Sequence, residues 1–297
     1  MLEVGWLQFT VTAAGVAVAE VQALLESLGA LSVTLTDADN EAILEPPPGS
    51  APLWDHTRVV GLFDGAVNPG ELLQALREAL PDPEATTLQQ EWIPNRPWER
   101  VWLEDFHPQR FGRRLWVCPT GQQPPEETAG SVVLTLDPGL AFGTGAHPTT
   151  ALCLAWLDGL DLTGRRVLDY GCGSGILAIA ALKMGAHQAL GIDHDPQALL
   201  ASHNNALANE VGAQLQVVAP GEAPDGGFEV VVANILANPL IELAPLLIQR
   251  LVPGGVLGLS GILADQAPDV ASAYASAVAW GPPVFNQGWA LLSGMKL

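Results

Sequence analysis

Three groups of residues in the second half of the chain could bind a nucleoside. Gly171, Gly173 and Gly175 alternate directly after an apolar segment, Asp193 ends a second apolar segment, and Asn234 ends a third. Alternating glycines let the backbone approach a ligand closely and adopt φ values that other residues avoid. Asp193 lies 22 residues beyond Gly171, close to the spacing at which a doubly wound sheet places a carboxylate against ribose hydroxyls. The pattern therefore predicts a nucleoside site.

The glycine turn also distinguishes between kinds of nucleoside cofactor. The dinucleotide fingerprint needs its third glycine at position 176, where the pyrophosphate meets the start of the helix, but this chain has Ile176 there. Ile176 argues against NAD and favours a nucleoside without phosphates, of which S-adenosylmethionine is the common example. Alternating glycines alone also occur in plain tight turns. The prediction depends on their combination with Asp193 and Asn234.

The elements around these residues alternate between strands and helices. The alanine-rich segment 176–184 predicts a helix that ends at Gly185, and Asp195-Pro196 is typical of a helix start. Further strands are expected at 214–218, 228–233 and 256–259. This alternation predicts an α/β fold with a mostly parallel, doubly wound sheet. Ligands of such sheets bind beyond the carboxyl ends of the strands.

The segment 136–150 precedes the glycine turn and is too rich in glycine and proline for a regular element. Phe142, Gly143, Thr144 and His147 offer an aromatic ring, a flexible backbone, a hydroxyl and an imidazole there. Long loops with this composition are often lids or binding loops. The plainer expectation for Thr149 or Thr150 is that it caps a helix over 151–157.

The first 93 residues predict a separate, smaller α+β domain. Strands are expected at 4–11, 31–36, 58–63 and 86–93, and helices at 16–28 and from Asn68-Pro69 to Leu80. The order βαββαβ is that of a ferredoxin-like unit. We find no catalytic constellation in it and expect it to hold a partner.

The segment 94–116 is a connector with many aromatic residues. Trp98, Trp102 and Phe106 recur every four residues, which predicts one apolar face on a short helix that begins near Pro97. Interdomain packing explains such a stripe better than a binding groove does. The sequence thus predicts domains at 1–93 and 117–297, joined by an aromatic helical linker at 94–116.

The net charge of the chain limits the kinds of partner that it can bind. The chain has 32 acidic and 12 basic residues, for a formal net charge of −20. Because nucleic-acid affinity comes largely from Lys and Arg, we expect no direct binding of nucleic acid. Three cysteines without CxxC spacing suggest neither a disulfide framework nor a metal site. With no signal-like start and no apolar run of 18 residues, we expect a cytoplasmic protein without a membrane anchor, acting as a monomer.

Several long stretches together resemble the methyltransferases of ribosomal protein L11, a family within the class I methyltransferase superfamily. The similarity runs nearly from end to end. It is carried by LWDHTRVVGLFD, FHPQRFGRRLWVCP, LDPGLAFGTGAHPTT, GCGSGILAIAALK, GIDHDPQA and VVANILA. The resemblance implies an N-terminal domain that recognises the ribosomal protein, a helical linker, and a domain that methylates amino groups, both lysine side chains and an α-amine, with S-adenosylmethionine.

The resemblance also implies roles for individual residues. Thr150, Gly171, Gly173, Asp193 and Asn234 would hold the cofactor, with the Phe142-Gly143-Thr144 loop closing over it. The chain departs from the family at three places, and these departures bear on substrate affinity more than on chemistry. They are His194 in place of an aliphatic residue, Pro97 in place of an acidic one, and a tail at 289–292 without the usual basic end.

Methyl transfer to an amine sets a chemical requirement for the site. The nucleophile must be neutral, although the pKa of a lysine side chain is about 10.4 and that of an α-amine about 8. An apolar pocket shielded by Phe142 would lower the pKa of the amine, and Asn234 Oδ1 could accept its hydrogens and aim its lone pair. His147 is a second candidate for contacting the amine. A hydrogen bond that stabilises the loop explains His147 equally well.

Two other functions are compatible with the sequence. A methyltransferase with the same cofactor could act on an amide or a small molecule, although Asn234-Ile235-Leu236-Ala237 is not the NPPY-type tetrapeptide that suits planar amide or adenine targets. A cofactor-binding protein without turnover could serve in ribosome assembly. Labelled S-adenosylmethionine and purified ribosomal proteins would separate the three hypotheses.

Overall fold

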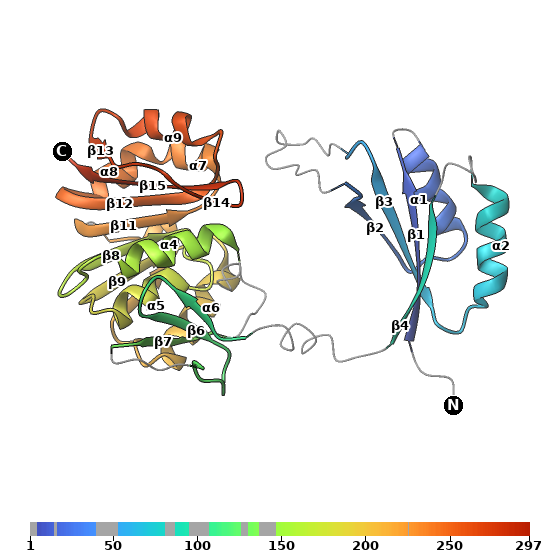
Figure 1. Cartoon of the computed structure of the whole chain (residues 1–297), viewed down its shortest axis with the longest axis horizontal. Coiled ribbons are helices and arrows are strands. Elements are labelled where there is room, and N and C mark those ends of the chain that lie inside the picture. Colours follow the sequence, from blue (N-terminus) through green and yellow to red (C-terminus); the bar gives the residue numbers. More distant parts are fainter. Residues whose placement is uncertain are drawn as a thin grey trace. The chain divides into compact units, whose positions relative to one another are not determined.

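The computed structural model divides the chain into two compact units, residues 1–101 and 102–297 (Figure 1). The residues that it describes are 5–14, 17–39, 53–80, 87–94, 107–125, 130–136, 147–224 and 226–297. Two sequence predictions lie outside these residues: the helix beginning near Pro97, and the loop Phe142-Gly143-Thr144.

The first unit is an antiparallel sheet with two helices. Its elements follow the predicted order βαββαβ: β1 (Gly5–Ala13), α1 (Ala17–Ser27), β2 (Ser32–Asp37), β3 (Thr57–Asp64), α2 (Pro69–Ala79) and β4 (Leu88–Pro94). The strand order β2-β3-β1-β4 is that of the ferredoxin-like fold and confirms the predicted α+β unit. Alternate strand residues such as Phe9, Val59 and Phe63 pack against Leu25 and Leu76 of the helices.

The second unit is built on a sheet with the strand order β10-β9-β8-β11-β12-β15-β13. Its parallel strands are β8 (Arg166–Tyr170), β9 (Gln188–Ile192), β10 (Leu215–Val218), β11 (Phe228–Asn234) and β12 (Leu251–Leu263). Three antiparallel strands complete it: β13 (Val278–Trp280), β14 (Val284–Asn286) and β15 (Trp289–Lys296). The prediction of a mostly parallel doubly wound sheet is confirmed.

Helices cover both faces of this sheet (Figure 1). One face packs against α4 (Pro148–Asp158), α5 (Ile176–Lys183) and α6 (Pro196–Ala208), and the other against α7 (Ala237–Glu242), α8 (Ala244–Arg250) and α9 (Ala267–Tyr274). Because adjacent strand residues point to opposite faces, Val230 and Val232 enter the first core and Val231 and Ala233 the second. Asp195 caps α6 as predicted, since its side chain accepts from the N–H of Gln197.

A small sheet that the sequence analysis did not predict joins the second unit. It contains β5 (Gln109–Phe111), β6 (Leu115–Cys118) and β7 (Val132–Thr135). Phe111, which falls in the predicted connector, is buried in the core beside α4 and α5. The buried Asp158 at the end of α4 fixes the β5–β6 turn, because its carboxylate accepts from the Arg113 N–H at 2.6 Å and the Arg114 Nε at 3.0 Å.

None of the helices in the described part of the chain is both long and apolar enough to span a bilayer. The same residues contain no group of three or more His, Cys, Asp or Glu side chains that could hold a metal ion.

Candidate functional site

The predicted site residues converge at the carboxyl edge of the sheet. β8 lies between β9 and β11, with Tyr170 opposite Ile192 on one side and opposite Ala233 on the other. The strand order reverses at this point, since β9 and β10 continue to one side and β11 and β12 to the other. Such a switch point is where open α/β sheets bind ligands. Gly171, Asp193 and Asn234 lie there, at the ends of β8, β9 and β11.

The turn after β8 requires its glycines. Gly171, Gly173 and Gly175 have φ values of +76°, +52° and +78°, in the left-handed region where glycine carries no steric penalty. At Gly171 a Cβ would also lie 2.3 Å from Cγ2 of Ile235. The chain of β8 therefore passes directly against the residue that follows Asn234. Ile176 begins α5 and is buried in the core.

Asp193 is held in one orientation by two backbone donors. Its Oδ2 accepts from the Gly173 N–H at 2.9 Å, and its Oδ1 accepts from the Asp195 N–H at 3.0 Å. The side chain of Asp193 is largely buried, and the residue lines the cavity described below. Since a carboxylate can accept about four hydrogen bonds, two donors leave capacity for ligand hydroxyls. Gly173 is not among the cavity-lining residues that the structure describes, so its contact with Asp193 is its link to the site.

Asn234 has a side-chain acceptor that no described residue pairs with. Its Nδ2 donates to the buried Thr150 Oγ1 at 3.3 Å, while its Oδ1 is buried and has no hydrogen-bond partner among the described residues. A buried acceptor left unpaired is costly, and this one belongs to a residue that lines the cavity. Thr150 itself is held behind Asn234 and orients its amide.

His147, not a threonine, caps the first helix of the site. The prediction that Thr149 or Thr150 caps the helix is wrong, because α4 begins earlier, at Pro148, and both threonines lie inside it. Nδ1 of His147 accepts from the Thr149 N–H at 3.3 Å and lies 2.7 Å from the Thr149 Oγ1. Burial lowers the pKa of His147, which favours the neutral ring that this cap needs. His147 thus makes a stabilising hydrogen bond at the start of α4.

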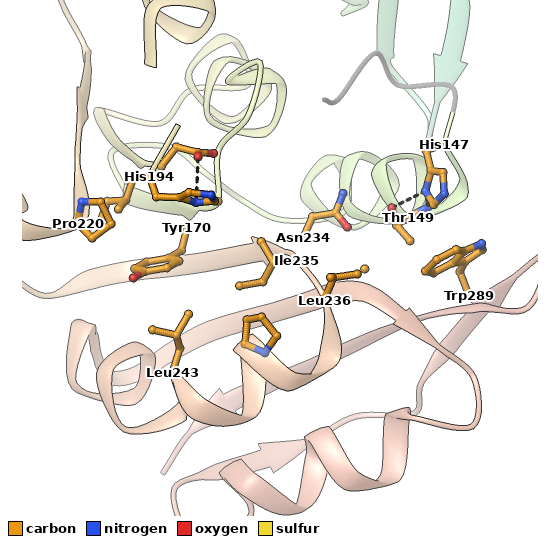
Figure 2. Close-up of a pocket in the computed structure, with 15 residues that line it drawn as sticks. His147, Thr149, Tyr170, His194, Pro220, Asn234, Ile235, Leu236, Leu243 and Trp289 are labelled. Atoms are coloured by element: carbon orange, nitrogen blue, oxygen red, sulfur yellow. Dashed lines mark hydrogen bonds and ion pairs between the residues drawn. The ribbon is translucent and has the colours of Figure 1, made fainter. Parts of the chain in front are cut away.

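A cavity of about 630 Å³ connects these residues. Its walls are almost entirely apolar, with the polar groups of Asp193 and Asn234 set into them. Figure 2 shows Tyr170, His194 and Pro220 at one end, His147, Thr149 and Trp289 at the other, and Asn234, Ile235 and Leu236 between the two ends. A cavity of this size accommodates an adenosine and a further small group.

Comparison with known proteins decides the family. The family model described as "Ribosomal protein L11 methyltransferase (PrmA)" matches residues 5–296. The chain belongs to the ribosomal protein L11 methyltransferase family. Curated members from Haemophilus ducreyi and Pasteurella multocida are 50% and 49% identical, over 98% and 97% of this chain and 99% and 98% of theirs. A crystal structure of ribosomal protein L11 methylase from Lactobacillus delbrueckii subsp. bulgaricus is 33% identical with a TM-score of 0.58, and covers 64% of this chain and 99% of that one.

The family membership confirms the resemblance found in the sequence. The chain is an S-adenosylmethionine-dependent methyltransferase with a class I α/β domain and a smaller antiparallel-sheet domain. The site of this L11-family methyltransferase fits such a cofactor on structural grounds. Gly171 lines the cavity with its backbone, Asp193 is preorientated at the edge of the cavity, and Asn234 Oδ1 has no hydrogen-bond partner among the described residues.

Sequence reasoning missed Trp289 as a site residue. Trp289 begins β15 and its ring stands edge-on to that of His147, with ring centroids 4.8 Å apart. Because β15 runs antiparallel to β12, it starts at the edge where the parallel strands end, and Trp289 pairs with Leu263 there. The signal in the sequence was an aromatic residue directly after Gln287-Gly288. In the structure these two residues form a turn with positive φ.

Asp169 is a titratable group directly beneath the site. It is fully buried on β8, where its Oδ2 accepts from the Ala178 N–H at 3.1 Å and its Oδ1 has no partner among the described residues. Burial, with a smaller effect of the Asp193 carboxylate, raises the pKa of Asp169 to about 7. An ionised Asp169 therefore opposes folding of the methyltransferase.

We expect Asp169→Asn to remove a pH dependence of stability. The folded-state pKa of Asp169 lies above its unfolded value of about 3.9. Its contribution to the free energy of unfolding is therefore fully present below pH ~4 and is lost as the pH rises through about 7, by at most about 1.4 kcal/mol per pH unit. Thermal unfolding measures the effect. The midpoint of the variant, relative to that of the native protein, should be higher at pH 8 than at pH 5. An equal difference at both pH values would contradict this role.

Proposed function

We propose that this methyltransferase transfers methyl groups from S-adenosylmethionine to amino groups of ribosomal protein L11, both lysine side chains and the α-amine. The observation that carries this proposal is the Oδ1 of Asn234, which has no partner among the described residues. It belongs to a nearly apolar cavity, beside a glycine turn and a preorientated carboxylate. Curated family members of about 50% identity carry the name of this reaction.

We assign one end of the cavity to the cofactor and the other end to the amine. The Asp193 carboxylate accepts hydrogen bonds from the ribose hydroxyls, the backbone of Gly171 lies against the nucleoside at the end of β8, and Thr150 holds the Asn234 amide. The bound cofactor supplies a methyl group on a positively charged sulfur, which keeps the electron pair of the broken C–S bond as the amine nitrogen forms its new bond to carbon.

The residues around Asn234 prepare the amine. Ile235 and Leu236 desolvate it, which lowers its pKa and favours the neutral nucleophile. Asn234 Oδ1 accepts one N–H and directs the nitrogen lone pair along the line of transfer. Positioning of this kind contributes up to roughly 7–11 kcal/mol in favourable cases. The proton that the amine must lose leaves to solvent.

Trp289 and His147 form the wall at the amine end. The face of an indole ring attracts an ammonium group and its methylated forms through its quadrupole. Trp289 therefore suits an amine that carries methyl groups from an earlier turnover. His147 contributes through its cap on α4 and its contact with Trp289.

The first 93 residues are the proposed recognition domain for the ribosomal protein. They carry 14 Asp and Glu residues and only two Arg, which suits a basic partner. The sheet face turned away from α1 and α2 has a hollow of about 510 Å³ with an apolar floor that includes Trp6, Val60 and Leu62. We expect the enzyme to work as a monomer in the cytoplasm without contacting nucleic acid, in keeping with its net charge of −20 and free cysteines.

We expect Leu62→Arg to raise the KM for ribosomal protein L11 by about tenfold or more. The change removes apolar contact from the hollow and adds a charge that repels a basic partner. Gln74→Arg adds the same charge on the exposed side of α2 and serves as the control. Steady-state methylation with a dilution series of the ribosomal protein measures the effect. Equal KM values for the two variants would argue against recognition at this face.

Incubation with labelled S-adenosylmethionine and separated large-subunit proteins tests the proposed reaction. We expect the label in one protein, L11, on amino groups resistant to base treatment. Label on amide or small-molecule acceptors would favour the methyltransferase with another substrate. No label, with intact cofactor binding, would favour an assembly factor without turnover.

A further inference from the structure

Helix α6 carries a line of polar side chains that contact backbone groups outside the helix. Ser202 and Asn205 lie three residues apart in α6, and Asn209, the residue at its C-cap, follows four residues later, so the three side chains share one face. Ser202 Oγ donates to the Gly173 carbonyl and Asn205 Nδ2 to the Ser174 carbonyl, each at 2.8 Å. Asn209 pairs with both the N–H and the carbonyl of Thr135, at 2.8 and 2.7 Å. The line thus joins α6 to the glycine turn and to the end of β7.

The contacts with the glycine turn lead directly to Asp193. Gly173, whose carbonyl accepts from Ser202, is the residue whose N–H donates to Asp193 Oδ2 at 2.9 Å. The second oxygen of Asp193 accepts from the N–H of Asp195, the residue that caps α6. Both oxygens of this carboxylate are therefore oriented by backbone that α6 holds in place.

The helix lies too close to the turn for these contacts to be incidental. Ser202 is fully buried, and a Cβ at Gly175 would lie 2.9 Å from its Oγ. Serine and asparagine are poor helix formers, and burying their polar atoms costs free energy unless they find partners. Alanine would satisfy the helix and the packing at Ser202 but would leave the Gly173 carbonyl without this donor.

We propose that Ser202 and Asn205 are positioning residues for cofactor binding. By holding the carbonyls of Gly173 and Ser174, they fix the Gly173 N–H that orients Asp193, and so set the affinity of the site for the ribose hydroxyls of the cofactor. This inference rests on the proposed assignment of Asp193 to the ribose.

Two ligands separate positioning from stability: S-adenosylhomocysteine and its 2′-deoxy counterpart. Calorimetry gives a Kd for each ligand. The preference ratio, which is the Kd of the 2′-deoxy ligand divided by the Kd of S-adenosylhomocysteine, reports on the contact with Asp193. We expect a ratio of about 10 or more in the native enzyme, since a hydrogen bond to a charged group is at stake. In Ser202→Ala and Asn205→Asp we expect the ratio to fall at least threefold, with S-adenosylhomocysteine bound about three- to tenfold more weakly.

The matched control is Asn204→Asp, the same chemical change one residue away on the exposed side of α6. It should keep the native ratio. At saturating S-adenosylmethionine, kcat of Asn205→Asp should stay within about twofold of the native value while its KM for the cofactor rises. That split distinguishes orientation of the ribose contact from damage to the reacting centre.

Two results would overturn the proposal, and they differ. If both α6 variants lose thermal stability but keep the native preference ratio, the two side chains only stabilise the helix contact. If the native enzyme shows no preference and Asp193→Ala binds S-adenosylhomocysteine as tightly as the native enzyme does, Asp193 does not contact the ribose and the premise itself fails. Should Ser202→Ala fail to fold, the isosteric Asn205→Asp still decides between these outcomes.

Discussion

Asn234→Ala should lower kcat for methylation of the ribosomal protein by about 10²–10³-fold. The variant removes the one buried acceptor in the described cavity that has no protein partner, and with it the group proposed to align the amine. Losses of this size follow when a preorganised polar group at a reacting centre is deleted. Single-turnover methylation at saturating ribosomal protein and cofactor measures the chemical step directly.

The Asn234 prediction has an internal control in Thr150. Thr150→Val keeps the shape of the buried side chain and removes the oxygen that accepts from Asn234 Nδ2. We expect a smaller loss of turnover, about tenfold, because the acceptor remains but is less well oriented. A loss of less than threefold in Asn234→Ala, with the cofactor still bound, would remove Asn234 from the mechanism.

Asp193→Ala should weaken binding of S-adenosylhomocysteine by about 10²-fold or more. The carboxylate is preorientated by Gly173 and Asp195 and lines the cavity. Hydrogen bonds to a charged group contribute about 1.5–3 kcal/mol each, and each 1.4 kcal/mol corresponds to about tenfold in Kd. Because the change affects cofactor binding more than alignment of the amine, kcat should recover substantially at high S-adenosylmethionine.

Isothermal calorimetry measures the affinity of Asp193→Ala for S-adenosylhomocysteine. The control is Asp269→Ala, which removes a carboxylate exposed on α9. Asp269→Ala should bind S-adenosylhomocysteine with native affinity. If Asp193→Ala binds within about threefold of native, the nucleoside does not lie at the end of β9.

Local sequence signals carried most of the fold. The glycine turn, the Asp195 cap and the start of α2 at Asn68-Pro69 each depend on residues a few positions apart, and each has the predicted form. The strand and helix alternation of the second unit follows from apolar runs separated by such turns. The convergence of Gly171, Asp193 and Asn234 follows in turn from the rule that parallel strands end at one edge.

Contacts between distant segments were harder to predict. Which residue caps α4 depends on where the loop turns into the helix, and the structure selects His147 over the threonines. Trp289 reaches the cavity because β15 runs antiparallel to β12. The residues of β15 do not by themselves reveal this direction. The β5–β7 sheet consists of strands of three or four residues, too short to show alternation.

A crystal structure with S-adenosylhomocysteine bound tests the central assignment most directly. We expect the ribose hydroxyls within hydrogen-bond distance of the Asp193 carboxylate, the nucleoside against Gly171, and the sulfur facing the side of the cavity where Asn234 Oδ1 lies. Density for the ligand at another place, with the cavity at the ends of β8, β9 and β11 left empty, would contradict the account.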